Sequence, residues 1–97
     1  MPAKRSADTS VPIHPAIAAR WSPRAFDPTA ELSDSDLTAV LEAARWAATW
    51  GRRQPVRFLV GRRADNVFVT LCGLLKRGND YAHAASALIL LCADEGP

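Results

Sequence analysis

Two arginines and a serine lie close together in residues 20–28, a segment with the sequence RWSPRAFDP. Arg20 and Arg24 each carry a planar guanidinium whose N–H groups match the oxygens of a phosphate, and the Ser22 hydroxyl adds a short, neutral hydrogen bond. Two prolines restrict this backbone, and two aromatic side chains can pack it. The segment is a candidate phosphate-binding loop, although a solvated surface loop is the commoner explanation for these three residues alone.

Five further arginines form two runs that offer a different chemistry, nucleic-acid binding. They are Arg52, Arg53, Arg57, Arg62 and Arg63. Few aromatic side chains alternate with them, and the formal net charge is only +2, whereas nucleic-acid-binding surfaces combine clustered basic residues with stacking aromatics. Nucleic-acid binding is therefore the weaker hypothesis, and we expect no such partner.

The histidines and cysteines show no pattern typical of a metal site or a catalytic triad. His14 and His83 have no triad partner or second ligand at a suitable spacing, and Cys72 and Cys92 form no C-x-x-C pair. We expect the histidines at the surface or at helix caps, and the thiols as small apolar residues. No catalytic side chain and no metal ligand is predicted.

The composition is that of an ordinary folded chain. Of its 97 residues, 48% are hydrophobic and 23% are charged, a balance that argues against extended disorder. Residues 1–13 contain no apolar stretch typical of a secretory signal, and the longest apolar run, residues 87–93, has about a third of the length of a membrane-spanning helix. We expect a cytoplasmic protein with no membrane partner, and residues 1–13 as a mobile tail.

Periodicity and turn residues predict four helices and two strands. The predicted helices are residues 14–20, 34–48, 65–75 and 79–85, and the predicted strands are residues 56–61 and 86–92. Helix 34–48 has the strongest signal, because Ser33 can cap its N-terminus and apolar residues from Leu37 to Ala48 recur every three or four positions. Gly78 is a candidate stop for the third helix.

The predicted strand 86–92 is apolar at nearly every position, which is typical of a strand covered on both faces. A sheet of only two strands leaves such a strand with uncovered faces and an open edge. Either another chain completes the sheet or the sequence is a piece of something longer. Trp46 and Trp50, near the end of helix 34–48, are expected to pack in the core or in an interface.

The segment HPAIAARWSPRAFD from His14, followed by a capped helix and by GRRQPVRF from Gly51, resembles the start of the nitroreductase family. The resemblance covers residues 14–94 and includes the order of the predicted elements. It implies an α+β, nitroreductase-like fold, truncated, with helices packed on a small sheet that has a central apolar strand. Residues 14–97 are then the N-terminal half of a nitroreductase-like domain.

The resemblance also implies which residues bind the cofactor FMN. In the family, an Arg-x-Ser-x-Arg segment binds the FMN phosphate and ribityl chain, which selects Arg20, Ser22 and Arg24. Trp21 contributes its backbone while its ring packs inward. The family's glycine turn lies against the flavin ring, and an asparagine meets the ring or the ribityl chain. The glycine turn adds Thr49, Trp50 and Arg52, and the asparagine is Asn79.

The activity implied by the resemblance is that of an FMN-dependent oxidoreductase, which transfers hydride from NAD(P)H through flavin to a nitroaromatic or quinone-like small molecule. The partner it implies is a second copy in a homodimer or a complementing chain. The glycine turn has four residues where the family has proline, serine, asparagine and tryptophan. They are Ala48, Thr49, Arg52 and Val56. These departures favour an alternative, a catalytically inactive binding or assembly module that needs a partner chain.

Overall fold

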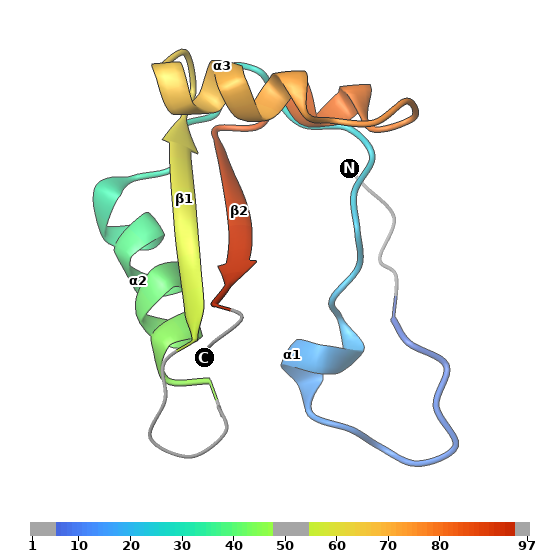
Figure 1. Cartoon of the computed structure of the whole chain (residues 1–97). Coiled ribbons are helices and arrows are strands. Elements are labelled where there is room, and N and C mark those ends of the chain that lie inside the picture. Colours follow the sequence, from blue (N-terminus) through green and yellow to red (C-terminus); the bar gives the residue numbers. More distant parts are fainter. Residues whose placement is uncertain (1–5, 48–54, 95–97) are drawn as a thin grey trace.

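The computed structural model describes residues 6–47 and 55–94. The elements follow in the order α1 (Pro15–Ala18), α2 (Asp34–Arg45), β1 (Val56–Arg62), α3 (Asn66–Gly73), the 3₁₀ helix η1 (Asp80–Ala84) and β2 (Ala87–Ala93). Figure 1 shows the two strands side by side, with α3 across one end of the sheet and α1 standing apart from it. The predicted α+β class is confirmed.

The two strands form one antiparallel sheet. The register places Phe58 opposite Leu91 and Leu59 opposite Leu90, so the members of each pair share a face. Along β1, half-buried residues alternate with exposed ones up to Val60, as the sequence predicts. Both strands begin within a residue of their predicted start, and both end one residue later than predicted.

The N-terminal cap of α2 is confirmed. The Ser33 Oγ accepts a hydrogen bond from Asp36 N at 3.1 Å and so satisfies one of the free N–H groups of the first turn. On the apolar side of the helix, Leu37 is buried, but Val40 is 51% exposed. The described chain therefore covers only part of the helix face that the sequence predicts to be buried.

The C-terminal end of α2 comes earlier than predicted. The last helical residue is Arg45, and Ala47 N donates to Ala44 O, a bond over three residues that tightens the final turn. Trp46 is 76% exposed and lies beside the Arg45 guanidinium, whose carbon is 5.1 Å from the ring centroid. Trp46 therefore does not pack in the core of the described chain, and packing in an interface stays a prediction. Trp50 lies outside the described residues.

The remaining helices are also shorter than predicted. α1 is a single turn, because the Arg20 N–H donates to Ile17 O instead of continuing the α-helical pattern. α3 ends at Gly73, and the next two N–H groups bond to carbonyls three residues back. Gly78 is not the stop of α3, since it adopts a φ of 95° in the turn that follows. Residues 80–84 form a 3₁₀ helix instead of an α-helix.

The packing of α3 on the sheet depends on Gly61 of β1. A Cβ atom at this position would lie 2.4 Å from the backbone nitrogen of Phe68 and 2.6 Å from its Cα. Only a residue without a side chain lets the helix backbone come so close. The contact buries Phe68 and Leu71, which are 5% and 8% exposed.

The turn between β1 and α3 carries backbone strain at Ala64. Asp65 N donates to Arg62 O at 2.9 Å, and Ala64, between them, has a φ of 71°. An L-residue in this left-handed region costs about 1 kcal/mol, a cost that glycine avoids.

We expect Ala64→Gly to raise the free energy of unfolding by about 0.5 kcal/mol or more, because relief of the left-handed strain outweighs the added freedom of the unfolded chain. Urea denaturation measures the change. The matched control is Ala43→Gly in the exposed part of α2, where the same substitution should destabilise by about 1 kcal/mol. If both substitutions lowered the free energy of unfolding, the result would contradict the left-handed conformation of Ala64.

Asp65 caps the N-terminus of α3. Its Oδ1 accepts from Phe68 N at 2.7 Å, and its Oδ2 accepts from Arg62 N at 3.0 Å. Both hydrogen bonds hold the pKa of this carboxyl below its ordinary value of 3.8, and the bond from Phe68 N has the larger effect.

This depressed pKa makes folding stability sensitive to acid. The carboxylate contributes fully above pH 3.8, and the contribution is lost as the pH falls through the lower folded-state pKa. Because asparagine also caps helices but does not ionise, Asp65→Asn should lose less stability than the natural chain between about pH 4 and pH 2. Urea midpoints measured across this range check the difference; parallel curves for the two proteins would show that Asp65 is not the group responsible.

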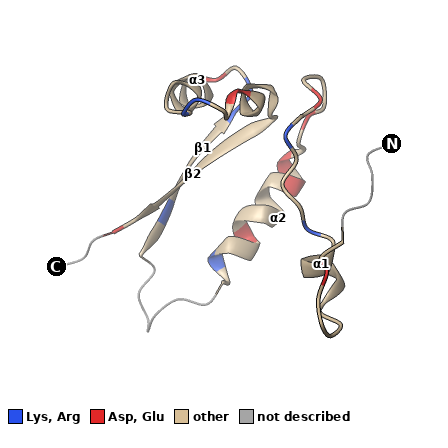
Figure 2. Cartoon of the chain, turned by 90° about the vertical axis from the view of Figure 1, so that its right-hand side faces the viewer, with Lys and Arg blue, Asp and Glu red and all other residues tan. Residues whose placement is uncertain are grey.

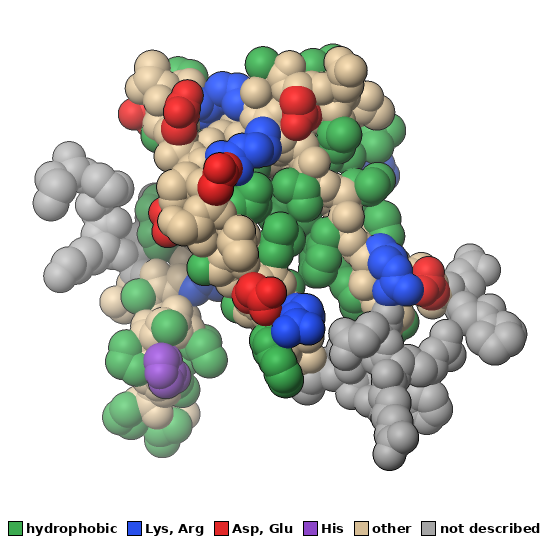
Figure 3. All heavy atoms as spheres, turned by 90° about the vertical axis from the view of Figure 1, so that its left-hand side faces the viewer, with side chains coloured by type: hydrophobic (Ala, Val, Ile, Leu, Met, Phe, Trp, Pro, Cys, Tyr) green, Lys and Arg blue, Asp and Glu red, His purple; other side chains and the backbone are tan. Residues whose placement is uncertain are grey.

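The described residues bury only a small core, which consists of Leu37, Phe68 and Leu71. Its radius of gyration is 16.0 Å, against about 12.5 Å for a compact domain of this length. Its accessible surface is 8341 Å², against about 5,400 Å² for a compact protein of 10.5 kDa. Hydrophobic side chains are visible at the surface of the face that carries α2 and β1 (Figure 3). No described helix is long and apolar enough to cross a membrane.

Candidate functional site

The basic loop, residues 20–28, runs along the surface between α1 and α2 (Figure 2). Arg20, Ser22 and Arg24 are all exposed. Arg20 Nη1 donates to Ser22 Oγ at 3.1 Å, so the structure brings a guanidinium and the hydroxyl together. Trp21 is 36% exposed and belongs to the exposed large hydrophobic side chains of the described chain, so the expectation that its ring packs inward stays a prediction.

The two guanidiniums of the basic loop carry charge that no described carboxylate neutralises. Ion pairs within the described residues join Arg45 to Glu42, Arg57 to Asp94 and Arg62 to Asp34, and neither Arg20 nor Arg24 takes part in one. Exposed guanidiniums and a hydroxyl on one loop are groups of the kind that bind a phosphate monoester, which carries close to two negative charges at neutral pH.

An aromatic contact anchors the end of the basic loop to η1. The rings of Phe26 and Tyr81 are 5.9 Å apart between centroids and inclined by 32°. Next to Phe26, the Asp27 Oδ1 accepts from Thr29 Oγ1 at 2.7 Å and from Thr29 N at 2.8 Å. Both hydrogen bonds lower the pKa of Asp27, and the bond from the Thr29 hydroxyl has the larger effect. These contacts fix the loop where it leaves the candidate site.

Arg63 connects the same region to the sheet. Its Nη1 donates to Ala30 O at 2.7 Å, and its Nη2 donates to Ala84 O at 2.9 Å and to Asp27 O at 3.5 Å. One side chain thus joins the segment before α2 to the end of η1. The sequence analysis missed this role, because the three carbonyls lie 21 to 36 residues away in sequence and no local pattern reveals them.

The other described arginines of the two runs also have partners within the chain. Arg62 Nη1 lies 2.7 Å from Asp34 Oδ1, and Nη2 donates to Leu32 O. Arg57 Nη2 lies 3.2 Å from Asp94 Oδ2. These bonds use the guanidiniums to hold the described chain together, which weakens the hypothesis that they form a nucleic-acid surface. Arg52 and Arg53 lie outside the described residues.

Asn79 lies at the start of η1, two residues before Tyr81. Its carbonyl accepts from Ala82 N at 3.0 Å, while its side chain makes no capping hydrogen bond. The carboxamide is exposed, and no hydrogen bond joins it to Arg20, Ser22 or Arg24 within the described chain. The structure thus brings Arg20 and Ser22 into contact. The helix η1, which follows Asn79, meets the basic loop through the Phe26–Tyr81 pair and through Arg63, which donates to Asp27 O and Ala84 O.

Three predicted flavin-binding residues, Thr49, Trp50 and Arg52, lie outside the described residues. The cofactor assignments of all eight residues therefore remain predictions. Across residues 6–47 and 55–94, no three His, Cys, Asp or Glu side chains form a group that could hold a metal ion.

The two-stranded sheet, the helix across its end and the anchored basic loop define a nitroreductase-like α+β fold. The chain belongs to the nitroreductase family, whose model matches residues 17–95. It is also similar to a solved chain described as an oxidoreductase containing FMN, with a TM-score of 0.81 and 32% sequence identity over 94% of the present chain.

A curated relative is an uncharacterised 15.4 kDa protein from Mycolicibacterium smegmatis, encoded in the 5′ region of ask. It is 67% identical over 49 residues, which cover 42% of the present chain and 33% of the relative. The match to the FMN-containing oxidoreductase covers 46% of that solved chain. The matched part of the present chain thus covers less than half the length of either protein.

Proposed function

We propose that this chain is part of an FMN-dependent oxidoreductase of nitroreductase type, which transfers hydride from NAD(P)H to a nitroaromatic or quinone-like acceptor. The observation that carries the proposal is the exposed Arg20–Ser22–Arg24 group, whose two guanidiniums have no ion-pair partner in the described chain. Family membership and the similarity to an oxidoreductase containing FMN support it.

The side chains present fit the phosphate end of FMN. Arg20 and Ser22 are already 3.1 Å apart, so a phosphate can accept from both at little cost in side-chain freedom. Arg24 is exposed on the same loop and supplies a second positive charge. When bound, the flavin supplies the hydride chemistry, and the chain's own residues hold its phosphate and fix its position.

The direct test adds FMN to the purified chain, removes free flavin, and records the visible absorption before and after addition of NAD(P)H. Retained flavin that bleaches with NAD(P)H supports an oxidoreductase. Retained flavin that does not bleach supports the alternative, an inactive binding or assembly module, which the uncovered apolar residues of β2 also favour. Absence of retention would overturn FMN binding by this chain.

We expect Arg24→Ala to weaken FMN binding about tenfold, the loss of one charge-assisted hydrogen bond to phosphate. Quenching of flavin fluorescence measures the dissociation constant. Riboflavin, which lacks the phosphate, should bind the natural chain and the variant equally. Arg45→Ala is the matched control, because Arg45 is an exposed arginine on α2 whose carboxylate partner is Glu42. An equal loss of riboflavin and FMN binding in Arg24→Ala would contradict a phosphate contact.

A further inference from the structure

The N-terminus of α1 is capped by a histidine side chain. His14 Nδ1 accepts a hydrogen bond from Ala16 N at 3.1 Å. The His14 residue is also exposed, so the surface and capping position that the sequence predicts for it is confirmed. A ring nitrogen that accepts a hydrogen bond carries no hydrogen, so the neutral ring holds its single hydrogen on Nε2.

This cap exists only while the ring is neutral. An imidazolium carries a hydrogen on both nitrogens and has no acceptor left for Ala16 N. Histidine gains its second ring proton near about pH 6.5, so the cap is available at about pH 8 and is lost by about pH 5. α1 is a single turn without a buried residue, and a turn that packs on nothing has little else to stabilise it.

α1 leads directly into the basic loop. Arg20 N donates to Ile17 O at 3.2 Å, and Arg20 Nη1 donates to Ser22 Oγ at 3.1 Å. The turn therefore sets the direction in which the backbone reaches Arg20. Once the turn opens, the Arg20 side chain gains freedom that binding of a phosphate must remove again.

The charged groups around α1 do not hold the His14 ring. α1 itself contains no charged residue. Residues 6–13, which are joined to α1 through the bond from Ala7 N to Ala18 O at 2.8 Å, contribute Asp8, and the basic loop contributes Arg20 at its start. Within residues 6–47 and 55–94, no ion pair joins His14 to a carboxylate. Protonation of the ring therefore acts first on its bond to Ala16 N.

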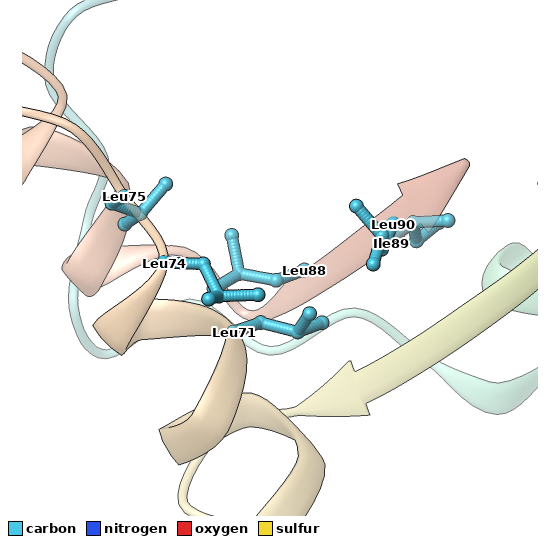
Figure 4. Close-up of a pocket in the computed structure, with 6 residues that line it drawn as sticks. All are labelled: Leu71, Leu74, Leu75, Leu88, Ile89 and Leu90. Carbon is cyan, nitrogen blue, oxygen red and sulfur yellow. The ribbon is translucent and has the colours of Figure 1, made fainter. Parts of the chain in front are cut away.

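The apolar part of the chain lies away from α1. Figures 1 and 2 show α1 apart from the sheet. The leucines between α3 and β2 line an open apolar hollow of about 170 Å³, in which Leu71 of α3 lies near Leu88 of β2 (Figure 4). No histidine lines this hollow. Its packing should not respond to protonation of His14, and its leucines serve as an internal reference.

We propose that His14 is a pH-sensitive cap, which opens α1 when the ring is protonated and thereby weakens phosphate binding by the basic loop. The effect on binding rests on the proposed FMN function. The opening of α1 does not, because the cap and the turn involve no residue of the basic loop except the backbone of Arg20.

The first test needs no flavin. Nitrogen-15 spectra of the natural chain at about pH 8 should show His14 with its hydrogen on Nε2. At about pH 5, Ala16 N–H should exchange with solvent about fivefold faster than in His14→Asn, because asparagine caps a helix but does not titrate. The amides of Leu71 and Leu88 should exchange equally in both proteins. A neutral ring with its hydrogen on Nδ1, or equal exchange of Ala16 N–H in both proteins, would overturn the cap.

The second test measures FMN dissociation constants at about pH 8 and about pH 5.5 by quenching of flavin fluorescence. The phosphate itself loses charge over this range, with a second ionisation near about pH 6, but it does so for both proteins. We expect the two proteins to bind equally at the higher pH, and the natural chain to lose about threefold more affinity than His14→Asn at the lower pH.

Equal losses in the two proteins would overturn the coupling of the cap to the basic loop. Tighter binding by the natural chain at the lower pH would also overturn it, because the imidazolium would then act by attracting the phosphate. If neither protein binds FMN at any pH, the proposed function fails, and with it the effect on binding, whereas the exchange of Ala16 N–H still decides whether His14 controls α1.

Discussion

Gly61→Ala should lower the free energy of unfolding by about 3 kcal/mol, the upper part of the range for an overpacked site. The new Cβ would lie 2.4 Å from Phe68 N, 2.6 Å from Phe68 Cα and 2.9 Å from Val67 C. All three are backbone atoms of α3, so no change of side-chain rotamer can relieve the clash. The helix must move away from the strand, and Phe68 and Leu71 then lose their burial.

The expected loss is large beside the total stability of a chain of this size, on the order of 5–15 kcal/mol. Urea denaturation followed by circular dichroism measures it. Gly73→Ala is the matched control, because nothing lies within 4 Å of a Cβ there and alanine favours the helix. Strand propensity alone predicts that alanine at position 61 stabilises the chain. A stabilised Gly61→Ala variant would therefore show that α3 does not approach β1 so closely.

The order of the elements could be predicted from the sequence, because local chemistry determines it. Ser33 caps α2 where the sequence predicts, and the strands start within a residue of their expected positions. The lengths of the helices were less predictable. Residues 46 and 47 lie within the predicted helix, yet both are exposed in the described chain, and tertiary packing is what stabilises most helices.

The candidate site was predictable only in part, for a related reason. Arg20 and Ser22 are two residues apart, so their contact follows from local geometry, and the motif reveals it. The anchors of the basic loop are long-range. Phe26 meets Tyr81, and Arg63 bonds to carbonyls on two other segments, contacts that depend on the completed fold. A motif identifies the residues able to bind a ligand, but it does not identify those that hold them in place.

Arg63→Met should destabilise the chain by about 2 kcal/mol, because hydrogen bonds from a charged donor contribute about 1.5–3 kcal/mol. Methionine keeps the length and apolar stem of the side chain but removes the donors to Ala30 O and Ala84 O. The stability of Arg63→Lys should lie between that of the natural chain and that of Arg63→Met, because an ammonium lacks the planar fork that reaches both carbonyls. Urea denaturation compares the three proteins.

The same substitution should also weaken FMN binding, although Arg63 is not among the predicted cofactor contacts. Without it, the segment from Asp27 to Ala30 is no longer joined to η1, and the basic loop before it gains freedom that binding must remove. Arg45→Met is the control, because an exposed pair on one helix contributes less than about 1 kcal/mol. If Arg63→Met left both stability and FMN affinity unchanged, the guanidinium would be a surface group, and the basic loop would be held by Phe26 and Tyr81 alone.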